Sequence, residues 1–200
     1  MDDETVAVYN KRASDYFTRF TSPKPGTALI NFIKHLPGSG KVLDLGCGPG
    51  NSSRHLIDEG YEVEAIDASE EMVRIANEAC GVNARLATFD EIDTSAGYVG
   101  VWANFALLHA PRSDFPRHIA SIAKSLSPGG IFHIGMKTGK GEKRDDIGRR
   151  YSYFEVGELE DELVRAGFAI LDVQTGEEAG LDGIVAPWAI LLAEKPSLSE

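Results

Sequence analysis

The chain has 200 residues, of which 42% are hydrophobic and 26% are charged, as is ordinary for a globular protein. This length suggests one domain with enough chain to bury a core. The formal net charge of −11 disfavours sequence-independent binding to nucleic acid, which depends on Lys and Arg neutralising phosphates. No apolar run approaches the roughly 20 residues that cross a bilayer, and Met1-Asp2-Asp3-Glu4 lacks the features of a signal peptide. The two cysteines, Cys47 and Cys80, form no metal or redox pattern, so we expect reduced thiols in a cytoplasmic protein without a metal site.

Hydrophobic periodicity predicts helices and strands that alternate along most of the chain. Two amphipathic helices come first, at 4–20 and 27–36, and S-P-K-P-G separates them. The strands that follow are expected at 41–45, 62–67, 84–87, 98–105 and 131–137, with helices at 51–59, 69–79 and 114–126 between them. A long polar segment, 138–150, then has no periodic pattern, and it precedes a helix at 155–166. Two closing strands, at 168–175 and 186–194, are predicted to form an antiparallel hairpin around a turn at 176–183.

This alternation predicts an α/β fold, a doubly wound parallel sheet with helices on both faces. We expect a single domain over residues 1–200. Its parts are N-terminal cap helices (1–38), a cofactor-binding core (41–137), a substrate-side loop (138–154), and a helix with the closing hairpin (155–194).

The most informative stretch is V-L-D-L-G-C-G-P-G-N at 42–51, in which an apolar strand runs into a glycine-rich turn and a helix. Glycine lets a ligand approach the main chain, and the free N–H groups of the following helix point at whatever occupies the turn. The next strand ends in Asp67, an acid placed to accept hydrogen bonds from ribose hydroxyls. The two features together predict a nucleoside-containing cofactor at the carboxyl edge of the sheet.

The spacing of the turn narrows the choice of cofactor. Glycines at 46, 48 and 50 give G-x-G-x-G, whereas a dinucleotide site has G-x-G-x-x-G and a P-loop requires Gly-Lys-Ser/Thr. Asp44 would repel a pyrophosphate but suits a cationic amino-acid group. D-L-G-C-G-P-G, with Asp67 ending the next strand, resembles the cofactor site of class I S-adenosylmethionine-dependent methyltransferases, and the resemblance extends over roughly 42–193.

This resemblance implies S-adenosyl-L-methionine as cofactor and a Rossmann-like sheet of seven strands, whose last strand inserts antiparallel. It also implies roles for named residues. Gly46, Cys47 and Gly48 would meet the methionine part beside Asp44, and Asp67 would bind the ribose. The adenine would contact Ala68, Met72 and either Phe89 or Asp90, and Met72 is equally well explained as a core residue of its helix.

On the reaction side, the resemblance places Asn104, at the end of the fourth strand, beside the cofactor. His109 is a candidate general base, or else a capping residue that only shapes the pocket. Tyr9 and Tyr16 lie seven residues apart on one face of the first helix, and would close over the cofactor or simply pack in the core. The basic cluster in 137–150 is either a solvated loop or a positive rim suited to an anionic substrate, and Arg149, Arg150, Tyr151 and Tyr153 could line the acceptor pocket.

The expected activity is methyl transfer to an oxygen, nitrogen or sulfur atom of a small-molecule acceptor. Small size and acidic charge favour a small molecule over nucleic acid, and we expect a monomer or homodimer with no membrane partner. Two alternatives stay open: a non-catalytic protein that binds S-adenosylmethionine, and a nicotinamide-dependent oxidoreductase, which the loop spacing disfavours.

Overall fold

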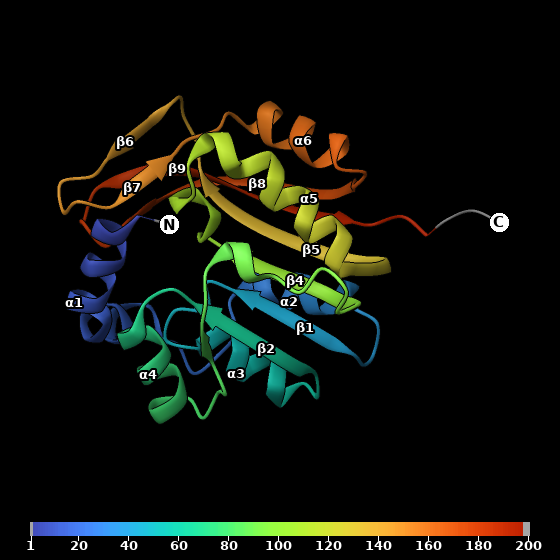
Figure 1. Ribbon diagram of the computed structural model, residues 1–200, viewed down its shortest axis with the longest axis horizontal. Helices are drawn as coiled ribbons and strands as arrows, with labels where there is room; N and C mark the ends of the chain where they lie inside the picture. The colour runs from blue at the N-terminus through green and yellow to red at the C-terminus, as the bar shows by residue number, and fades with distance from the viewer. Residues whose placement is uncertain (1, 198–200) are drawn as a thin grey trace.

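The computed structural model describes residues 2–197, which form a seven-stranded sheet with helices on both faces (Figure 1). In sheet order the strands are β3 (Arg85–Leu86), β2 (Glu62–Asp67), β1 (Lys41–Leu45), β4 (Tyr98–Asn104), β5 (Leu126–Lys137), β9 (Val185–Glu194) and β8 (Ala169–Ala179). β9 runs antiparallel to both of its neighbours, and the other pairings are parallel. The predicted Rossmann-like fold is therefore confirmed, including the inserted last strand.

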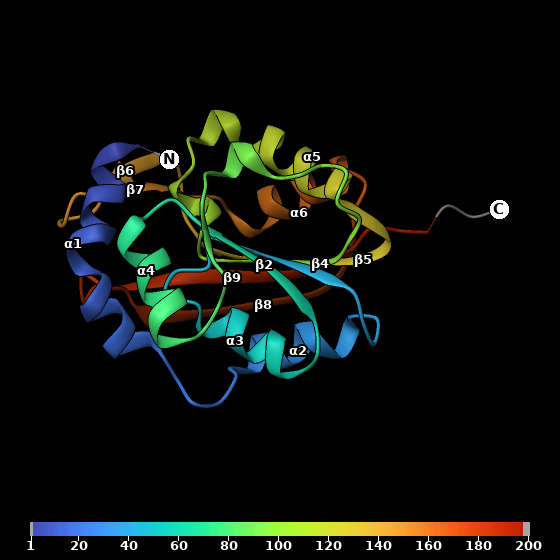
Figure 2. The same ribbon diagram turned by 60° about the horizontal axis from the view of Figure 1, so that its bottom comes forward.

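The helices form a layer on each side of the sheet and a cap at its edge. α2 (Thr27–His35) and α3 (Asn51–Asp58) cover one face, and α5 (Phe115–Ser125) and α6 (Val156–Arg165) cover the other (Figure 2). α1 (Asp3–Phe20) packs against α4 (Glu70–Ala79) at the end of the molecule where the strands finish. Short 3₁₀ turns occupy η1 (Phe89–Glu91), η2 (Leu107–His109) and η3 (Arg112–Asp114). No helix within residues 2–197 is long and apolar enough to cross a membrane.

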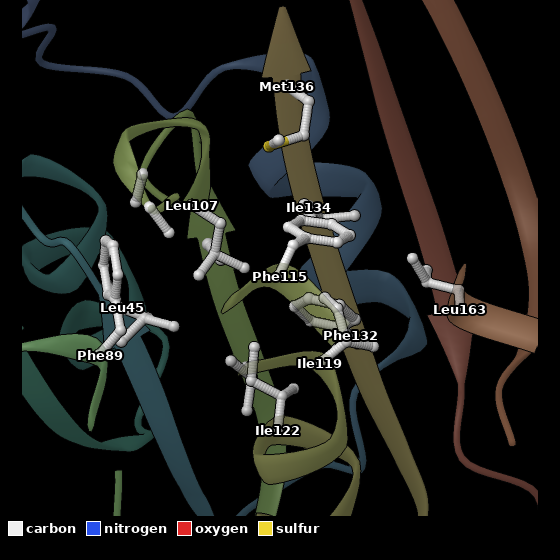
Figure 3. Packing of buried hydrophobic residues seen from close by; sticks show 14 of the residues in the cluster. Leu45, Phe89, Leu107, Phe115, Ile119, Ile122, Phe132, Ile134, Met136 and Leu163 are labelled. Carbon is white, nitrogen blue, oxygen red and sulfur yellow. The ribbon is translucent and has the colours of Figure 1, made fainter. Parts of the chain in front are cut away.

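The largest part of the core lies between the sheet and the α5–α6 layer. The apolar residues of α5 recur at intervals of four and three, which gathers them on one helical face, while alternate residues of β5 share one face of the sheet. Their side chains meet in Figure 3, where Phe115, Ile119 and Ile122 of α5 lie beside Phe132, Ile134 and Met136 of β5. This packing holds β4 and β5 rigidly, so that their carboxyl ends can carry a site.

The segment 138–150, expected to be a loop, differs from that expectation. It contains β6 (Glu142–Arg144), which pairs antiparallel with β7 (Arg150–Ser152). The Asp145 side chain closes the connection by accepting hydrogen bonds from the main-chain N–H groups of Ile147 and Arg149. Each strand has only three residues, too few to show a period of two. β8 also continues to Ala179, so the closing turn is shorter than predicted.

On the opposite face, α2 packs so closely on the sheet that Gly100 of β4 has no room for a side chain. A Cβ at Gly100 would lie 2.4 Å from Leu36 and 2.8 Å from Phe32. We therefore expect Gly100→Ala to lower the free energy of unfolding by roughly 1–3 kcal/mol, as overpacking does. Gly38→Ala is the matched control, because a Cβ there meets nothing within 4 Å. Urea denaturation measures both variants, and equal stabilities would contradict this account of the packing.

Candidate functional site

A cavity of about 430 Å³ opens at the carboxyl ends of the strands. Its walls come from α1, the turn after β1, the end of β4, and the β7 and β8–β9 segments that close over them. The side chains and turns that matter below are Tyr9, Tyr16, Asp44, Gly46, Cys47, Gly48, Trp102, Asn104, Phe105, His109, Lys137, Arg149, Tyr151 and Trp188. A second cavity of about 50 Å³ adjoins it and shares seven lining residues, among them Tyr9, Tyr16, Gly46 and Gly48.

The turn after β1 needs its glycines for two reasons. Gly46 and Gly48 have φ of 73° and 53°, a region that side chains disfavour. In addition, a Cβ on Gly46 would lie 2.5 Å from Cβ of Ala106, so the turn packs directly on the segment after β4. Cys47, between the glycines, is buried, and burial raises the pKa of its thiol, which keeps it protonated. The turn therefore presents main chain, rather than charged side chains, to the cavity.

Asp67 ends β2 and fixes this turn. Its Oδ2 accepts a hydrogen bond from the N–H of Gly48 at 2.8 Å, and its Oδ1 accepts one from the N–H of Ser69 at 2.8 Å. Burial raises the pKa of the carboxyl, and the main-chain N–H donors partly oppose that shift. Each carboxylate oxygen can accept two hydrogen bonds. Asp67 lines the smaller cavity, so it keeps capacity for further donors there.

Asp44 lies at the floor of the larger cavity, almost fully buried. Its Oδ2 accepts a hydrogen bond from the Ser53 hydroxyl at 2.5 Å. Burial raises the pKa of Asp44 to about 7, and the Ser53 hydrogen bond opposes this effect. A carboxyl group poised near neutrality can change charge when a cation arrives beside it.

His109 belongs to a chain of hydrogen bonds that fixes its tautomer. Its Nδ1 lies 2.6 Å from the carbonyl oxygen of Arg150, which can only accept, so Nδ1 carries the proton. Nε2 is then an acceptor, and the Tyr9 hydroxyl donates to it at 2.7 Å. Arg149 in turn donates to the Tyr9 oxygen at 3.2 Å. Burial lowers the pKa of His109 to about 3, so the imidazole is neutral at pH 7 and accepts the Tyr9 hydrogen bond as a weak base.

Asn104, at the end of β4, is held by a side chain of the neighbouring strand β5. His133 Nε2 lies 3.1 Å from its Oδ1, and the His133 ring stacks on Trp102 with centroids 3.6 Å apart. With Oδ1 facing His133, the amide nitrogen of Asn104 is free to donate elsewhere. Neither His133 nor Trp102 was singled out by sequence reasoning, because each fits a buried strand equally well as core.

Residues of α1 and α4 narrow the smaller cavity. Tyr9 and Tyr16 line both cavities, with ring centroids 6.1 Å apart, and Met72 lines only the smaller one. Met72 is also buried against α1, as expected for a core residue of its helix, and its contact with the adenine stays a prediction. The two tyrosines lie on the cavity-facing side of the helix, as their spacing predicts.

Three residues expected at the adenine edge lie outside both cavities. Phe89 is buried in the main core, and Asp90 forms an ion pair with Arg117 on the surface. Ala68 lines neither cavity. The structure therefore does not bring these three residues together with the rest of the site.

The basic segment contributes selectively to the cavity. Arg149 and Tyr151 line it, as does Lys137, whereas Arg150 pairs with Glu142 and Tyr153 stays outside. Trp188 of β9 lines the cavity next to Lys137, its partner in the β5–β9 pairing. No sequence signal marks Trp188, because its place depends on how the last strand inserts.

Comparison with known proteins finds similarity to methyltransferases. A family model described as "Methyltransferase domain" matches residues 42–130. An uncharacterized methyltransferase of Staphylococcus carnosus is 28% identical over 80% of this chain and 75% of its own length. A trans-aconitate 2-methyltransferase of Variovorax paradoxus is 34% identical over 71% of this chain, and the match spans about half (53%) of that enzyme.

Solved structures show the same fold. The 1,6-didemethyltoxoflavin-N1-methyltransferase of Burkholderia thailandensis, with bound 1,6-didemethyltoxoflavin and S-adenosylhomocysteine, has a TM-score of 0.73 at 24% identity. The match covers 97% of this chain and 90% of that one. A methyltransferase of Methanosarcina mazei has a TM-score of 0.74 at 18% identity and is covered over 99% of its length.

The raised pKa of Asp44 predicts how stability depends on pH. The folded state holds this proton up to about pH 7, whereas an unfolded Asp loses it near pH 4. The folded state thus binds more protons in between, so stability falls as pH rises from 5 to 7, by up to about 2 kcal/mol. Asp44→Asn removes this contribution. Urea denaturation at pH 5, 6 and 7 measures the difference between the two proteins, and parallel pH profiles would show that Asp44 ionises normally.

Proposed function

The chain belongs to the class I S-adenosylmethionine-dependent methyltransferases, and we propose that it transfers the methyl group to a small-molecule acceptor bound in the larger cavity. The observation that carries the proposal is that the glycine turn, Tyr9 and His109 border two adjoining cavities, of which the smaller is lined by Asp67 and the larger by Lys137. A volume of about 430 Å³ suits a small molecule, since such pockets span roughly 300–1,000 Å³. The similar protein of Variovorax paradoxus also carries the name of a small acceptor, trans-aconitate.

The residues present fit the chemistry of the cofactor. Gly46 and Gly48 leave a main-chain cradle with no Cβ, where the methionine part would lie beside Cys47. Asp44 would face its ammonium group, and Asp67 would use its spare lone pairs for the ribose hydroxyls. The side chain of Asn104 would donate from its amide, because His133 occupies its oxygen.

α1 would have to shift to admit the nucleoside. The cavity beside Asp67 is about 50 Å³, and one water molecule already takes about 30 Å³ of liquid volume. Tyr9, Tyr16 and Met72 take up the remaining space. We infer that α1 and α4 separate to admit the cofactor. Its adenine then meets Ala68 and the Phe89–Asp90 turn, with α1 covering it from its shifted position.

When bound, S-adenosylmethionine supplies a methyl group on a sulfonium sulfur that is already a strong electrophile. The protein's share of the work is to align the acceptor, exclude water and accept a proton. Tyr9 is placed for the last of these. Its oxygen can take a proton from the acceptor while its own proton moves to Nε2 of His109, 2.7 Å away. Because burial lowers the pKa of His109, this transfer would follow methylation, when the newly methylated hydroxyl oxygen is strongly acidic, rather than deprotonate the acceptor beforehand.

The ribose role of Asp67 is tested by Asp67→Ala, which removes a charged acceptor. We expect affinity for S-adenosylmethionine to fall by roughly 1.5–3 kcal/mol, typical of hydrogen bonds to a charged group. Isothermal titration calorimetry measures this, with Asp58→Ala as the surface control, since Asp58 is exposed and pairs only within α3. Circular dichroism checks that the turn is still folded. Unchanged affinity, or binding of NAD in place of S-adenosylmethionine, would contradict the assignment.

The relay is tested by Tyr9→Phe and His109→Asn, each of which breaks the 2.7 Å hydrogen bond. For an acceptor that carries a proton, we expect turnover to fall by about 10² or more, as for general bases. Affinity for S-adenosylhomocysteine should change much less than turnover. His35→Asn is the control, because His35 is exposed on α2. If the Tyr9 and His109 variants turn over as fast as the unaltered protein, neither residue takes part in the mechanism.

A further inference from the structure

We propose that the acceptor is a small hydroxy or amino acid whose carboxylate binds Lys137 and whose nucleophilic oxygen or nitrogen faces Tyr9. This inference rests on the proposed methyl transfer and specifies its substrate class. The inference follows from the Lys137 ammonium, which lines the cavity. Within the described residues it has no ion-pair partner, and it lies near the Tyr9–His109 pair.

Lys137 is the last residue of β5 and is half-buried in the cavity wall. Within residues 2–197, its ammonium takes part in no hydrogen bond and in no ion pair within 4.0 Å, although its Nζ lies 5.0 Å from the centre of the Tyr151 ring. Burial lowers the pKa of this lysine, and Asp182, beyond ion-pair distance, opposes that effect. Since partly burying an unpaired charge is costly, and the three N–H donors remain unused, an anion is the natural partner.

The other buried cation of the cavity is already occupied. Arg149 donates from Nε to Asp145 at 2.9 Å, and its Nη2 lies 2.7 Å from the same carboxylate. Asp182 approaches the guanidinium to 4.0 Å, and Nη1 donates to the Tyr9 hydroxyl. The charge of Arg149 is therefore balanced by Asp145 and Asp182 while it positions Tyr9, whereas within residues 2–197 Lys137 has no carboxylate within 4.0 Å.

Tyr151 sets the separation between the two ends of the acceptor. The same aromatic ring has the Lys137 ammonium at 5.0 Å and the His109 ring at 4.9 Å from its centre. The ammonium therefore lies within about 10 Å of the His109 ring, so a compact acid can reach from Lys137 to the Tyr9–His109 pair. The wall also holds the aromatic side chains of Trp102, Phe105 and Trp188, which suit a compact apolar body, and the exposed carboxylate of Glu178.

Binding can be followed directly, because both tryptophans of the chain, Trp102 and Trp188, line the cavity. The probes are 3-hydroxybutyrate, β-alanine and 4-hydroxyphenylacetate, each paired with its primary amide. With S-adenosylhomocysteine present, we expect at least one acid to change tryptophan fluorescence saturably. Its amide should bind at least about tenfold more weakly, because it cannot form the charged hydrogen bond.

Three variants test whether Lys137 causes the preference for the acid over its amide. Lys137→Met should abolish the acid-over-amide preference and raise KM for the bound acid at least about tenfold, with a much smaller change in kcat. Lys137→Arg keeps the charge and should retain most of the preference. Lys140→Met is the matched control, because Lys140 is exposed in the next turn and pairs with Glu155. Calorimetry with S-adenosylhomocysteine should give equal affinities for all three.

The outcomes separate the two proposals. If no acid binds, if amides bind equally well, or if Lys137→Met keeps the preference, the acceptor assignment is wrong while S-adenosylhomocysteine binding leaves the proposed function standing. If the unaltered protein binds no S-adenosylhomocysteine, the proposed function itself fails. Saturable binding of an acid that depends on Lys137, followed by its methylation, supports both.

Discussion

The parallel pairing of β1 between β2 and β4 is the constraint on which the rest of the site depends. It brings the ends of three strands to one edge, so that Asp44, Asp67 and Asn104 come together from distant parts of the sequence. The turn that follows β1 can then donate an N–H to Asp67, and its glycine packs against the segment after β4. In a doubly wound sheet this edge is where ligands bind, because the connections diverge there.

Segments outside the sheet orient the His109 and Tyr9 side chains. The carbonyl of Arg150 dictates the proton position on His109, and thereby the direction of the Tyr9 hydroxyl. The orientation of His109 is thus fixed by hydrogen bonds with both the β6–β7 segment and α1. Arg144 reinforces the arrangement by pairing with Asp2 and Glu4 at the start of α1. The two covering segments form one structure over the cavity, although most of the chain lies between them.

The glycine turn, Asp67 and the alternating strands could be predicted from the sequence because their physics is local: positive φ, a strand end, and hydrophobic periodicity. The role of Trp188 could not, since it depends on the long-range pairing of β9 with β5. The β6–β7 hairpin could not be predicted because each strand has only three residues, of which all three in β6 are exposed and two in β7 are buried. The contact of Tyr9 with His109 likewise joins residues a hundred positions apart, and neither residue signals the other.

The division of the cavity wall along the chain has a consequence for how such proteins diverge. The matched family model ends at residue 130, before Lys137, Arg149, Tyr151 and Trp188, and it begins after Tyr9. The family model therefore covers the glycine turn and Asp67, which we propose to hold the cofactor. The segments outside it, to which we assign acceptor binding, can change without disturbing the turn after β1, so relatives with one shared chemistry can come to modify unrelated compounds.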